Sequence, residues 1–461
     1  MTSWIANTRN IRYPAYAIQI LKGNMSTGSV ISYLWLSMGM GVLSLLTPCV
    51  FPMVPITVSY FANHSSRSRV GALREAALYG LGIMLTFIGL GMSLAMIFGA
   101  AGINKLAANP WVNLSITAIF LGFALSLLGL FFFQVPSGLM NRLHRTSTDK
   151  GDSSIVGTLL MGLTFSLTSF TCTAPFVGTL LVLASQGNWR WPLVGMTGFS
   201  FVFAVPFFLL ALAPQLMTQM PKAGGWMNSV KVVMGFLEIA AAMKFLSNAD
   251  LIWHWNMFTR PVVLCIWSAC LLMVVAYLLG WYRLEHDSEL LNVSGVRVVF
   301  ALCFLAGSMW LLNGLAGTNL GELEAFLPPI AASSGATAAA PIEEPWILND
   351  LPKALAEAKS QGRPVFIDFT GYTCTNCRWM EANIFSRPDI RKNMDRFVKV
   401  RLYTDGSGKT YSDQQDLENK RFGTVALPLY ALLNSNGDTI ETSAGVTRNP
   451  GEFAAFLNKA H

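Results

Sequence analysis

Charged residues are scarce in this chain. Asp, Glu, Lys and Arg make up 12% of its 461 residues, whereas an average soluble domain carries about 25%. Hydrophobic residues make up 53%, and the mean hydropathy is +0.46. The deficit is uneven, because residues 29–320 are mostly apolar runs with short polar breaks, while residues 342–461 have the composition of an ordinary globular domain. This excludes a wholly soluble protein and indicates a membrane protein with a soluble appendage.

Acidic residues are scarcer than basic ones, which leaves a net charge of +7 and a pI near 9.0. The cations lie mostly in the short segments between apolar runs, where arginine and lysine orient membrane proteins. We therefore expect a lipid bilayer as the partner of this surface, and no nucleic acid.

Eight apolar segments are close to the roughly 20 residues that a helix needs to cross a bilayer. They cover residues 31–61, 76–99, 112–134, 155–185, 192–213, 226–247, 261–282 and 297–317. The loops after the first and third spans are rich in cations and are predicted to be cytoplasmic, which puts both termini outside. These cations are Arg67, Arg69, Arg74, Arg142, Arg145 and Lys150.

The N-terminal tail, residues 1–28, argues against this orientation, because its three cations, Arg9, Arg12 and Lys22, would have to be moved across the membrane. The tail has no convincing signal peptide. Met25 is an alternative start that would remove the three cations, and the sequence leaves both starts open.

The first and fourth spans share a Cys-x-x-Pro motif, Pro48-Cys49-Val-Phe-Pro52 in one and Cys172-Thr-Ala-Pro175 in the other. Each is followed by two further spans, so the two three-span units have opposite topology, as in inverted-repeat transporters. The prolines remove backbone donors and kink helices, which at membrane depth requires burial in protein or a wet cavity. We expect broken helices around both cysteines, with water enough for thiolate chemistry.

An isolated membrane cysteine is usually a small packing residue. The matched context favours a functional pair for Cys49 and Cys172, whereas Cys265, Cys270 and Cys303 lack such a context and are predicted to pack.

Glu238 lies deep in the sixth span, where a carboxyl is costly and often functional. Proton handling is one interpretation, and pairing or polar packing between helices is the other. Lys231 and Lys244 flank Glu238 and are placed to extend toward the membrane interface.

The remainder divides into a low-complexity linker at 321–345, flexible by composition, and an α/β domain at 346–461. Helices are expected over 351–359, 377–385 and 453–459, and strands over 365–369, 397–403, 429–433 and 439–442. This alternation is the order of a thioredoxin-like fold. The fold class is thus a polytopic α-helical membrane domain, residues 29–320, followed by a thioredoxin-like domain.

The domain carries Cys374-Thr-Asn-Cys377 at a predicted strand–helix junction, which is a fairly specific redox signal. Zinc would need two further ligands, and the domain has no other cysteine and only His461, so we expect no metal and no cofactor. A helix N-terminus lowers the pKa of a thiol, so Cys374 is predicted to attack and Cys377, one turn in, to resolve.

Two further residues of this domain are candidates. Asp368 lies six residues before Cys374 and is interpreted either as the acceptor of the resolving thiol's proton or as an ordinary strand-end aspartate. Pro428 precedes a predicted strand and suits a cis-proline that presents backbone to a substrate.

The Cys49 and Cys172 segments, the eight spans and the C-terminal domain together resemble the DsbD family of thiol:disulfide interchange proteins over residues 30–461. The membrane part is also similar to the smaller CcdA proteins of cytochrome c biogenesis. The resemblance implies an electron-conducting membrane domain in the bacterial inner membrane. There, cytoplasmic thioredoxin would reduce the membrane pair, and that pair would reduce the periplasmic Cys374–Cys377 pair.

Three departures from the pattern stand out. The usual N-terminal periplasmic domain is missing from this sequence, so its role is expected of a separate periplasmic thiol–disulfide protein. Thr373 stands where thioredoxins usually have tryptophan, and Leu427 stands where threonine is common before the cis-proline.

The leading hypothesis is a protein-disulfide reductase that conducts reductant through the membrane. A solute transporter with a fused redox regulator and a quinone-linked disulfide oxidase are the alternatives.

Overall fold

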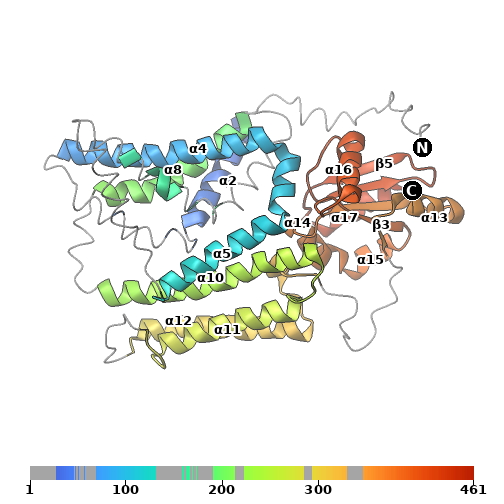
Figure 1. Ribbon diagram of the computed structural model, residues 1–461. Coiled ribbons are helices and arrows are strands. Elements are labelled where there is room, and N and C mark those ends of the chain that lie inside the picture. Colours follow the sequence, from blue (N-terminus) through green and yellow to red (C-terminus); the bar gives the residue numbers. More distant parts are fainter. Residues whose placement is uncertain are drawn as a thin grey trace. The chain divides into compact units, whose positions relative to one another are not determined.

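The computed structural model describes residues 27–45, 69–130, 158–159, 162–166, 190–212, 223–284, 293–329 and 346–460, together with the single positions 47, 50, 57, 169 and 173. Five of the candidate site residues lie outside the described residues: Pro48, Cys49, Pro52, Cys172 and Pro175. The cations of the N-terminal tail, Arg67 and those of the loop after the third span lie outside them too. The chain divides into two compact units, residues 1–97 with 147–214 and residues 98–146 with 215–461 (Figure 1).

The first unit is a helical bundle with an aromatic centre. Helix α2 (Thr27–Leu45) packs against α8 (Arg190–Leu212). Helix α4 (Arg69–Ala107) lies so close to residues 162–166 that a Cβ on Gly162 would be 3.2 Å from the Tyr79 carbonyl oxygen. The rings of Phe87, Phe165, Phe199, Phe203 and Phe207 fill the space between these helices.

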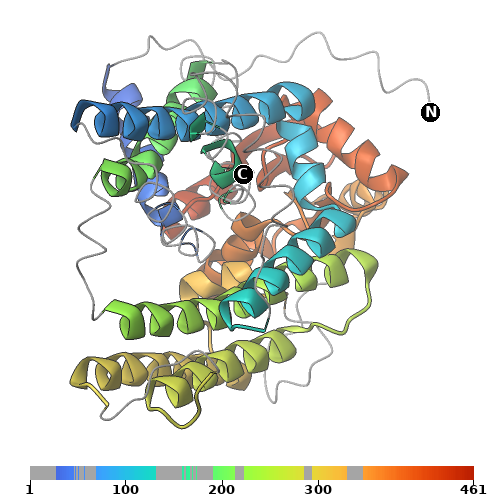
Figure 2. The ribbon, with the colours of Figure 1, turned by 60° about the vertical axis from the view of Figure 1, so that its left-hand side comes forward.

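In the membrane part of the second unit, the described residues include two pairs of helices, and Figures 1 and 2 both show the two members of each pair side by side. Helix α5 (Pro110–Leu127) packs along α10 (Ala223–Trp253), and α11 (Arg260–Leu278) packs along α12 (Gly295–Asn313). In the first pair the Asn248 side chain donates to Asn113 at 3.3 Å, and Phe120 meets Phe245 with ring centroids 5.4 Å apart.

These packing partners follow the predicted repeats. The first helix of each predicted three-span repeat packs against the second helix of the other: α2 against α8, and residues 162–166 against α4. The third helices, α5 and α10, pack against each other. Inverted repeats related by a pseudo-two-fold axis would produce this exchange of partners, and the repeats stay a prediction.

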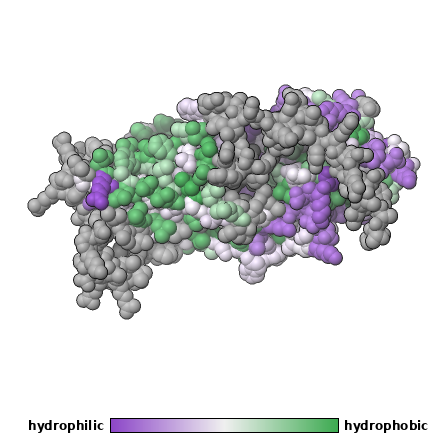
Figure 3. All heavy atoms as spheres, turned by 90° about the horizontal axis from the view of Figure 1, so that it is seen from above, coloured by the Kyte–Doolittle hydropathy of each residue, from purple (hydrophilic) through white to green (hydrophobic). Residues whose placement is uncertain are grey.

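Within the described residues, five helices are long and apolar enough to cross a bilayer. The spanning segments are Leu73–Ser93, Pro110–Leu127, Pro192–Ala211, Arg260–Leu278 and Gly295–Ala316. Large apolar side chains on their outer faces are exposed, for example Leu85, Leu209 and Phe300. On the one face that it views, Figure 3 shows an extended apolar surface in green. Lipid is the environment in which such a surface is stable. The total of eight spans stays a prediction.

The C-terminal domain is a five-stranded sheet in the order β1-β3-β2-β4-β5. The strands are β1 (Ile347–Leu348), β2 (Val365–Thr370), β3 (Val398–Tyr403), β4 (Leu429–Leu433) and β5 (Thr439–Ala444). Strands β1, β3 and β2 are parallel, and β4 and β5 are antiparallel to their neighbours. The helices are α13 (Leu351–Gln361), α14 (Thr375–Met380), α15 (Pro388–Met394), α16 (Lys409–Phe422) and α17 (Pro450–Leu457), with a π-helical turn, η3 (Glu381–Phe385), and a final 3-10 turn, η4 (Asn458–Ala460).

Strand β2 is the centre of this domain, and all six of its residues are buried. Successive side chains point to opposite faces of a sheet. Phe366 therefore packs with Tyr430 and Phe453 on one side, while Ile367 packs with Val400 in the core on the other side. Two covered faces hold β2 rigid, and its carboxyl end leads directly to the cysteine motif.

The segment after α12 is more ordered than the sequence suggested. The linker was expected to begin at residue 321, but the 3-10 turns η1 (Gly314–Ala316) and η2 (Gly321–Phe326) continue the fold. The reason is a buried ion pair, in which Arg260 contacts Glu324 at 2.7 Å and also donates to the Gly314 carbonyl. A buried arginine needs such partners, and two of them, Gly314 and Glu324, belong to these turns.

Candidate functional site

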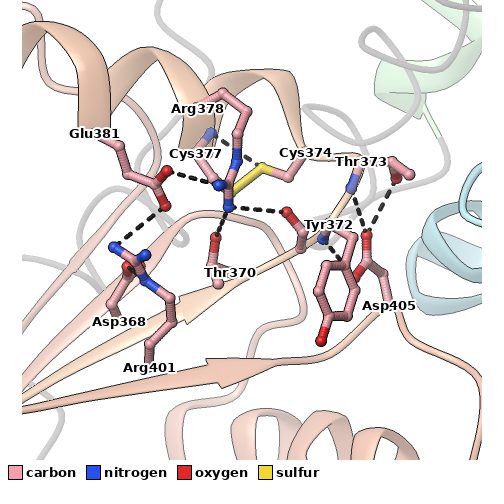
Figure 4. Close-up of a disulfide and its surroundings, with 11 residues drawn as sticks. Asp368, Thr370, Tyr372, Thr373, Cys374, Cys377, Arg378, Glu381, Arg401 and Asp405 are labelled. Atoms are coloured by element: carbon pink, nitrogen blue, oxygen red, sulfur yellow. Dashed lines mark hydrogen bonds and ion pairs between the residues drawn. A yellow bond between two sulfur atoms is a disulfide. The ribbon is translucent and has the colours of Figure 1, made fainter. Parts of the chain in front are cut away.

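The Cys374–Cys377 disulfide lies where β2 passes into α14 (Figure 4). Cys374 is the N-cap of α14, and its sulfur accepts a hydrogen bond from the Cys377 amide at 3.1 Å. Cys374 is half-buried, whereas Cys377 is 1% exposed. Only the first sulfur is therefore open to an incoming thiol, and the amide that faces it stabilises negative charge on it.

Asp405 holds the turn that precedes the motif. Its carboxylate accepts hydrogen bonds from the amides of Tyr372 at 2.7 Å and Thr373 at 3.0 Å, and from the Thr373 hydroxyl at 3.1 Å. Burial raises the pKa of Asp405, and these hydrogen bonds oppose the rise. The Tyr372 ring also stacks on Tyr403, with centroids 4.0 Å apart. The residue before Cys374 is thus fixed through its backbone and hydroxyl.

Gly371 is required by this arrangement. A Cβ at this position would lie 2.6 Å from Asp405 Oδ2 and 3.2 Å from the Cys374 Cβ. The side chains of the turn and of Asp405 occupy the volume that any other residue would need.

Replacing Gly371 with alanine is expected to displace Asp405 and to destabilise the domain by about 2–4 kcal/mol, through overpacking and the loss of buried hydrogen bonds. Pulse proteolysis of the full chain in a urea series would measure the shift in the unfolding midpoint. Gly295→Ala is the matched control, because its added methyl group would meet nothing within 4 Å. Equal midpoints for the two variants would contradict this account of the turn.

A chain of four buried or half-buried charges lies behind the disulfide (Figure 4). Asp368 Oδ2 accepts from Arg401 Nε at 2.9 Å, and Arg401 Nη2 lies 3.3 Å from Glu381 Oε1. Glu381 Oε2 in turn lies 2.7 Å from Arg378 Nη1. Arg378 completes the chain by donating to the Gly371 carbonyl at 3.3 Å. The chain carries no net charge and joins the centre of the sheet to the cysteine turn.

Asp368 is the most buried member of this chain, at 1% exposure. Burial raises the pKa of Asp368 to about 6, and the positive charge of Arg401 opposes the rise. The sequence placed Asp368 at the end of the strand, whereas it lies within β2 and pairs with Arg401 on β3 and Tyr430 on β4.

The structure also describes two further candidate residues, Pro428 and Glu238. The Leu427–Pro428 peptide bond is cis, as predicted, and leads into β4. Glu238 is fully buried within α10, and its role stays a prediction. Among the described residues no cluster of histidine, cysteine or acidic side chains is suited to a metal ion.

Sequence reasoning missed Arg378, Glu381, Arg401 and Asp405. Arg378 and Glu381 follow the second cysteine at one and four residues, a spacing that puts them on one helical face. Arg401 lies in a strand in which charged and apolar residues alternate. A charged residue in such a pattern equally often faces solvent, so the pattern does not indicate a buried ion pair.

Comparison with known families matches both parts of the chain. Residues 30–249 match the cytochrome c biogenesis protein transmembrane domain, and residues 346–435 match a thioredoxin-like domain.

Three curated relatives are similar to this chain over more than four fifths of its length. The thiol:disulfide interchange protein DsbD of Vibrio cholerae is 29% identical over 417 residues, which cover 88% of this chain and 63% of that protein. The protein DsbD 2 of Pseudomonas aeruginosa is 31% identical over 83% of this chain and 63% of its own length. DsbD of Cronobacter sakazakii is 30% identical over 88% of this chain and 65% of its own length. The chain thus spans a little under two thirds of these relatives. The similarity extends over both its membrane helices and its Cys-x-x-Cys domain, and the chain belongs to the DsbD family of thiol:disulfide interchange proteins.

Proposed function

We propose that this chain carries reducing equivalents from cytoplasmic thioredoxin across the bacterial inner membrane to disulfide-containing periplasmic proteins, by successive thiol–disulfide exchange. The observation that carries this proposal is the disulfide of the C-terminal domain, in which half-buried Cys374 caps a helix and Cys377 is buried behind it. This is the asymmetry that a two-cysteine exchange reaction requires, with one sulfur to be attacked and one to resolve.

The electrons pass in pairs. The dithiol of thioredoxin reduces a Cys49–Cys172 disulfide, and the thioredoxin is oxidised to its own disulfide. The membrane dithiol then attacks Cys374, which releases Cys377 as a thiol, and a second attack within the membrane pair releases Cys374. The reduced domain finally transfers two electrons to the acceptor's disulfide, and the Cys374–Cys377 bond forms again. Each step breaks one disulfide and makes one, so no cofactor is needed.

Four residues of the domain have separate roles in this proposal. Cys374 makes the mixed disulfide, and Cys377 resolves it. Asp368 takes the proton of Cys377, and Pro428 presents backbone to the partner. In the membrane part, Pro48, Pro52 and Pro175 break the helices around the cysteine pair, and Glu238 is a candidate for proton handling.

The orientation in this proposal comes from the loop charges. The cation-rich loops after the first and third spans are cytoplasmic, and with eight spans the C-terminal domain is periplasmic. Electron flow then runs downhill without an ion gradient. From about −270 mV, typical of thioredoxin, to about −180 mV, typical of a disulfide isomerase, two electrons release about 4 kcal/mol.

The direction of flow can be tested in cells. We expect Cys374 and Cys377 to be mainly reduced in cells with an active thioredoxin system and oxidised when thioredoxin reductase is depleted. Acid quenching followed by a mass-shifting alkylating reagent would measure the two states. A quinone-linked oxidase would instead leave the pair oxidised in both conditions, and a transporter would keep moving its solute after loss of Cys49 and Cys172. Either result would contradict the proposal.

A further inference from the structure

The buried carboxyl of Asp368 forms an ion pair with Arg401. It lies on the central strand, at 1% exposure, and Arg401 reaches it from the neighbouring strand β3 at 2.9 Å. Trp346 covers the guanidinium of Arg401, whose Cζ lies 4.4 Å from the centroid of the indole. The Arg401 side chain is therefore held between an aromatic ring and two carboxylates, those of Asp368 and Glu381.

Every element packed against Asp368 contributes to its electrostatics. Strand β3 supplies the cation of Arg401, and α14 supplies that of Arg378. The turn η3 supplies the negative charge of Glu381, and β4 supplies the neutral phenol of Tyr430. Burial drives the carboxyl toward its neutral form, and Arg401 is the cation in direct contact with it.

We propose that Arg401 is a positioning residue that keeps Asp368 ionised near neutral pH, so that Asp368 can accept the proton of Cys377 during resolution. The inference rests on the proposed function and adds a residue to it. A neutral Asp368 cannot take a second proton, so a chain without Arg401 resolves mixed disulfides only at higher pH.

The proton balance of the step is simple. In the mixed disulfide, Cys374 is bonded to the partner's sulfur and Cys377 is a thiol. Cys377 gives its proton to the Asp368 carboxylate and attacks the Cys374 sulfur, and the partner's sulfur leaves as a thiolate. Asp368 afterwards returns its proton to solvent. The pH at which the step reaches half its full rate therefore reports the ionisation of Asp368.

The test uses the full chain in detergent, with Cys49, Cys172, Cys265, Cys270 and Cys303 replaced by alanine. Reduced protein reacts with 5,5′-dithiobis(2-nitrobenzoic acid) in a stopped-flow instrument. The first thionitrobenzoate released reports attack by Cys374, and the second reports resolution by Cys377. Both rates are recorded from pH 5 to pH 9.

We expect the second phase to reach half its full rate near pH 6 with Arg401 present, as the pKa of about 6 for Asp368 implies. Removal of an adjacent opposite charge shifts a carboxyl upward by roughly 1–3 units. Arg401→Gln should therefore move the midpoint up by at least one pH unit and slow resolution at pH 6 by about fivefold or more. Arg401→Lys, which keeps the cation, should stay close to the parent.

Two controls distinguish an effect on Asp368 from a nonspecific effect of losing a cation and from an effect that does not pass through Asp368. Arg387→Gln removes an exposed cation whose side chain is 49% exposed and should change nothing. In an Asp368→Asn background, Arg401→Gln should cause no further shift, because the coupled group is gone. An equal loss of rate at all pH values, or a shift that persists in that background, would overturn the inference. Normal two-phase exchange in the parent would meanwhile leave the proposed function intact, whereas no second phase in the parent would contradict the function itself.

Discussion

A Cys377→Ala variant is expected to accumulate a covalent bond between Cys374 and one of the membrane cysteines, Cys49 or Cys172. Cys374 is half-buried at the start of α14 and accepts the hydrogen bond of an amide, so it is the sulfur that exchanges first. Cys377 is 1% exposed and acts only within the domain. Without Cys377, the mixed disulfide has lost the thiol that normally resolves it.

The trapped species can be detected by cleaving the chain between its two parts. A protease site inserted within residues 330–345 separates the membrane part from the C-terminal domain. On a non-reducing gel the Cys377→Ala halves should stay joined, and those of Cys374→Ala should separate. Cys303→Ala, which removes an exposed free cysteine, should behave like the parent. Joined halves in Cys374→Ala with separated halves in Cys377→Ala would show that the two roles are reversed.

Loss of either Cys49 or Cys172 is expected to leave the Cys374–Cys377 bond oxidised in cells. A single membrane thiol can form a mixed disulfide but cannot complete a two-electron reduction. With both cysteines present, a difference of about 90 mV between donor and acceptor corresponds to an equilibrium constant of about 10³, so the parent domain should be mainly reduced.

Acid quenching and alkylation would show the redox state of the domain in each variant. Cys270→Ala is the matched control, because Cys270 is a buried free cysteine of α11. A reduced C-terminal domain in Cys49→Ala or Cys172→Ala would mean that its electrons arrive by another route.

The sequence predicted the α/β domain well where apolar residues alternate or run together. Strand β2 and strand β4 are buried throughout, and their apolar runs marked them. Helix α16 was missed because its sequence, from Lys409 to Phe422, is almost wholly polar and lacks an apolar stripe. The fourteen-residue helix is nevertheless stable in the domain, since Leu417 and Phe422 pack on the core.

At the cysteine site, too, the sequence predicted some residues and missed others. Local spacing was enough to find Cys374, Cys377 and the cis-proline, because these depend on neighbours along the chain. The ion pairs of Arg401 could not be found in this way, because its partners Asp368 and Glu381 come from another strand and from a helical turn. Charges that meet only through the register of β2 and β3 leave no trace in a linear pattern.

Electron transfer in inverted membrane vesicles tests the central claim most directly. Their outer surface is the cytoplasmic face, and the proposed orientation encloses the C-terminal domain. Reduced thioredoxin, regenerated by NADPH and thioredoxin reductase, is added outside, and the redox state of Cys374 and Cys377 is read by alkylation after lysis. The proposal predicts reduction of the enclosed pair in the parent chain and none in Cys49→Ala or Cys172→Ala. An enclosed pair that stays oxidised in the parent, or becomes reduced in either variant, would contradict transfer through the membrane cysteines.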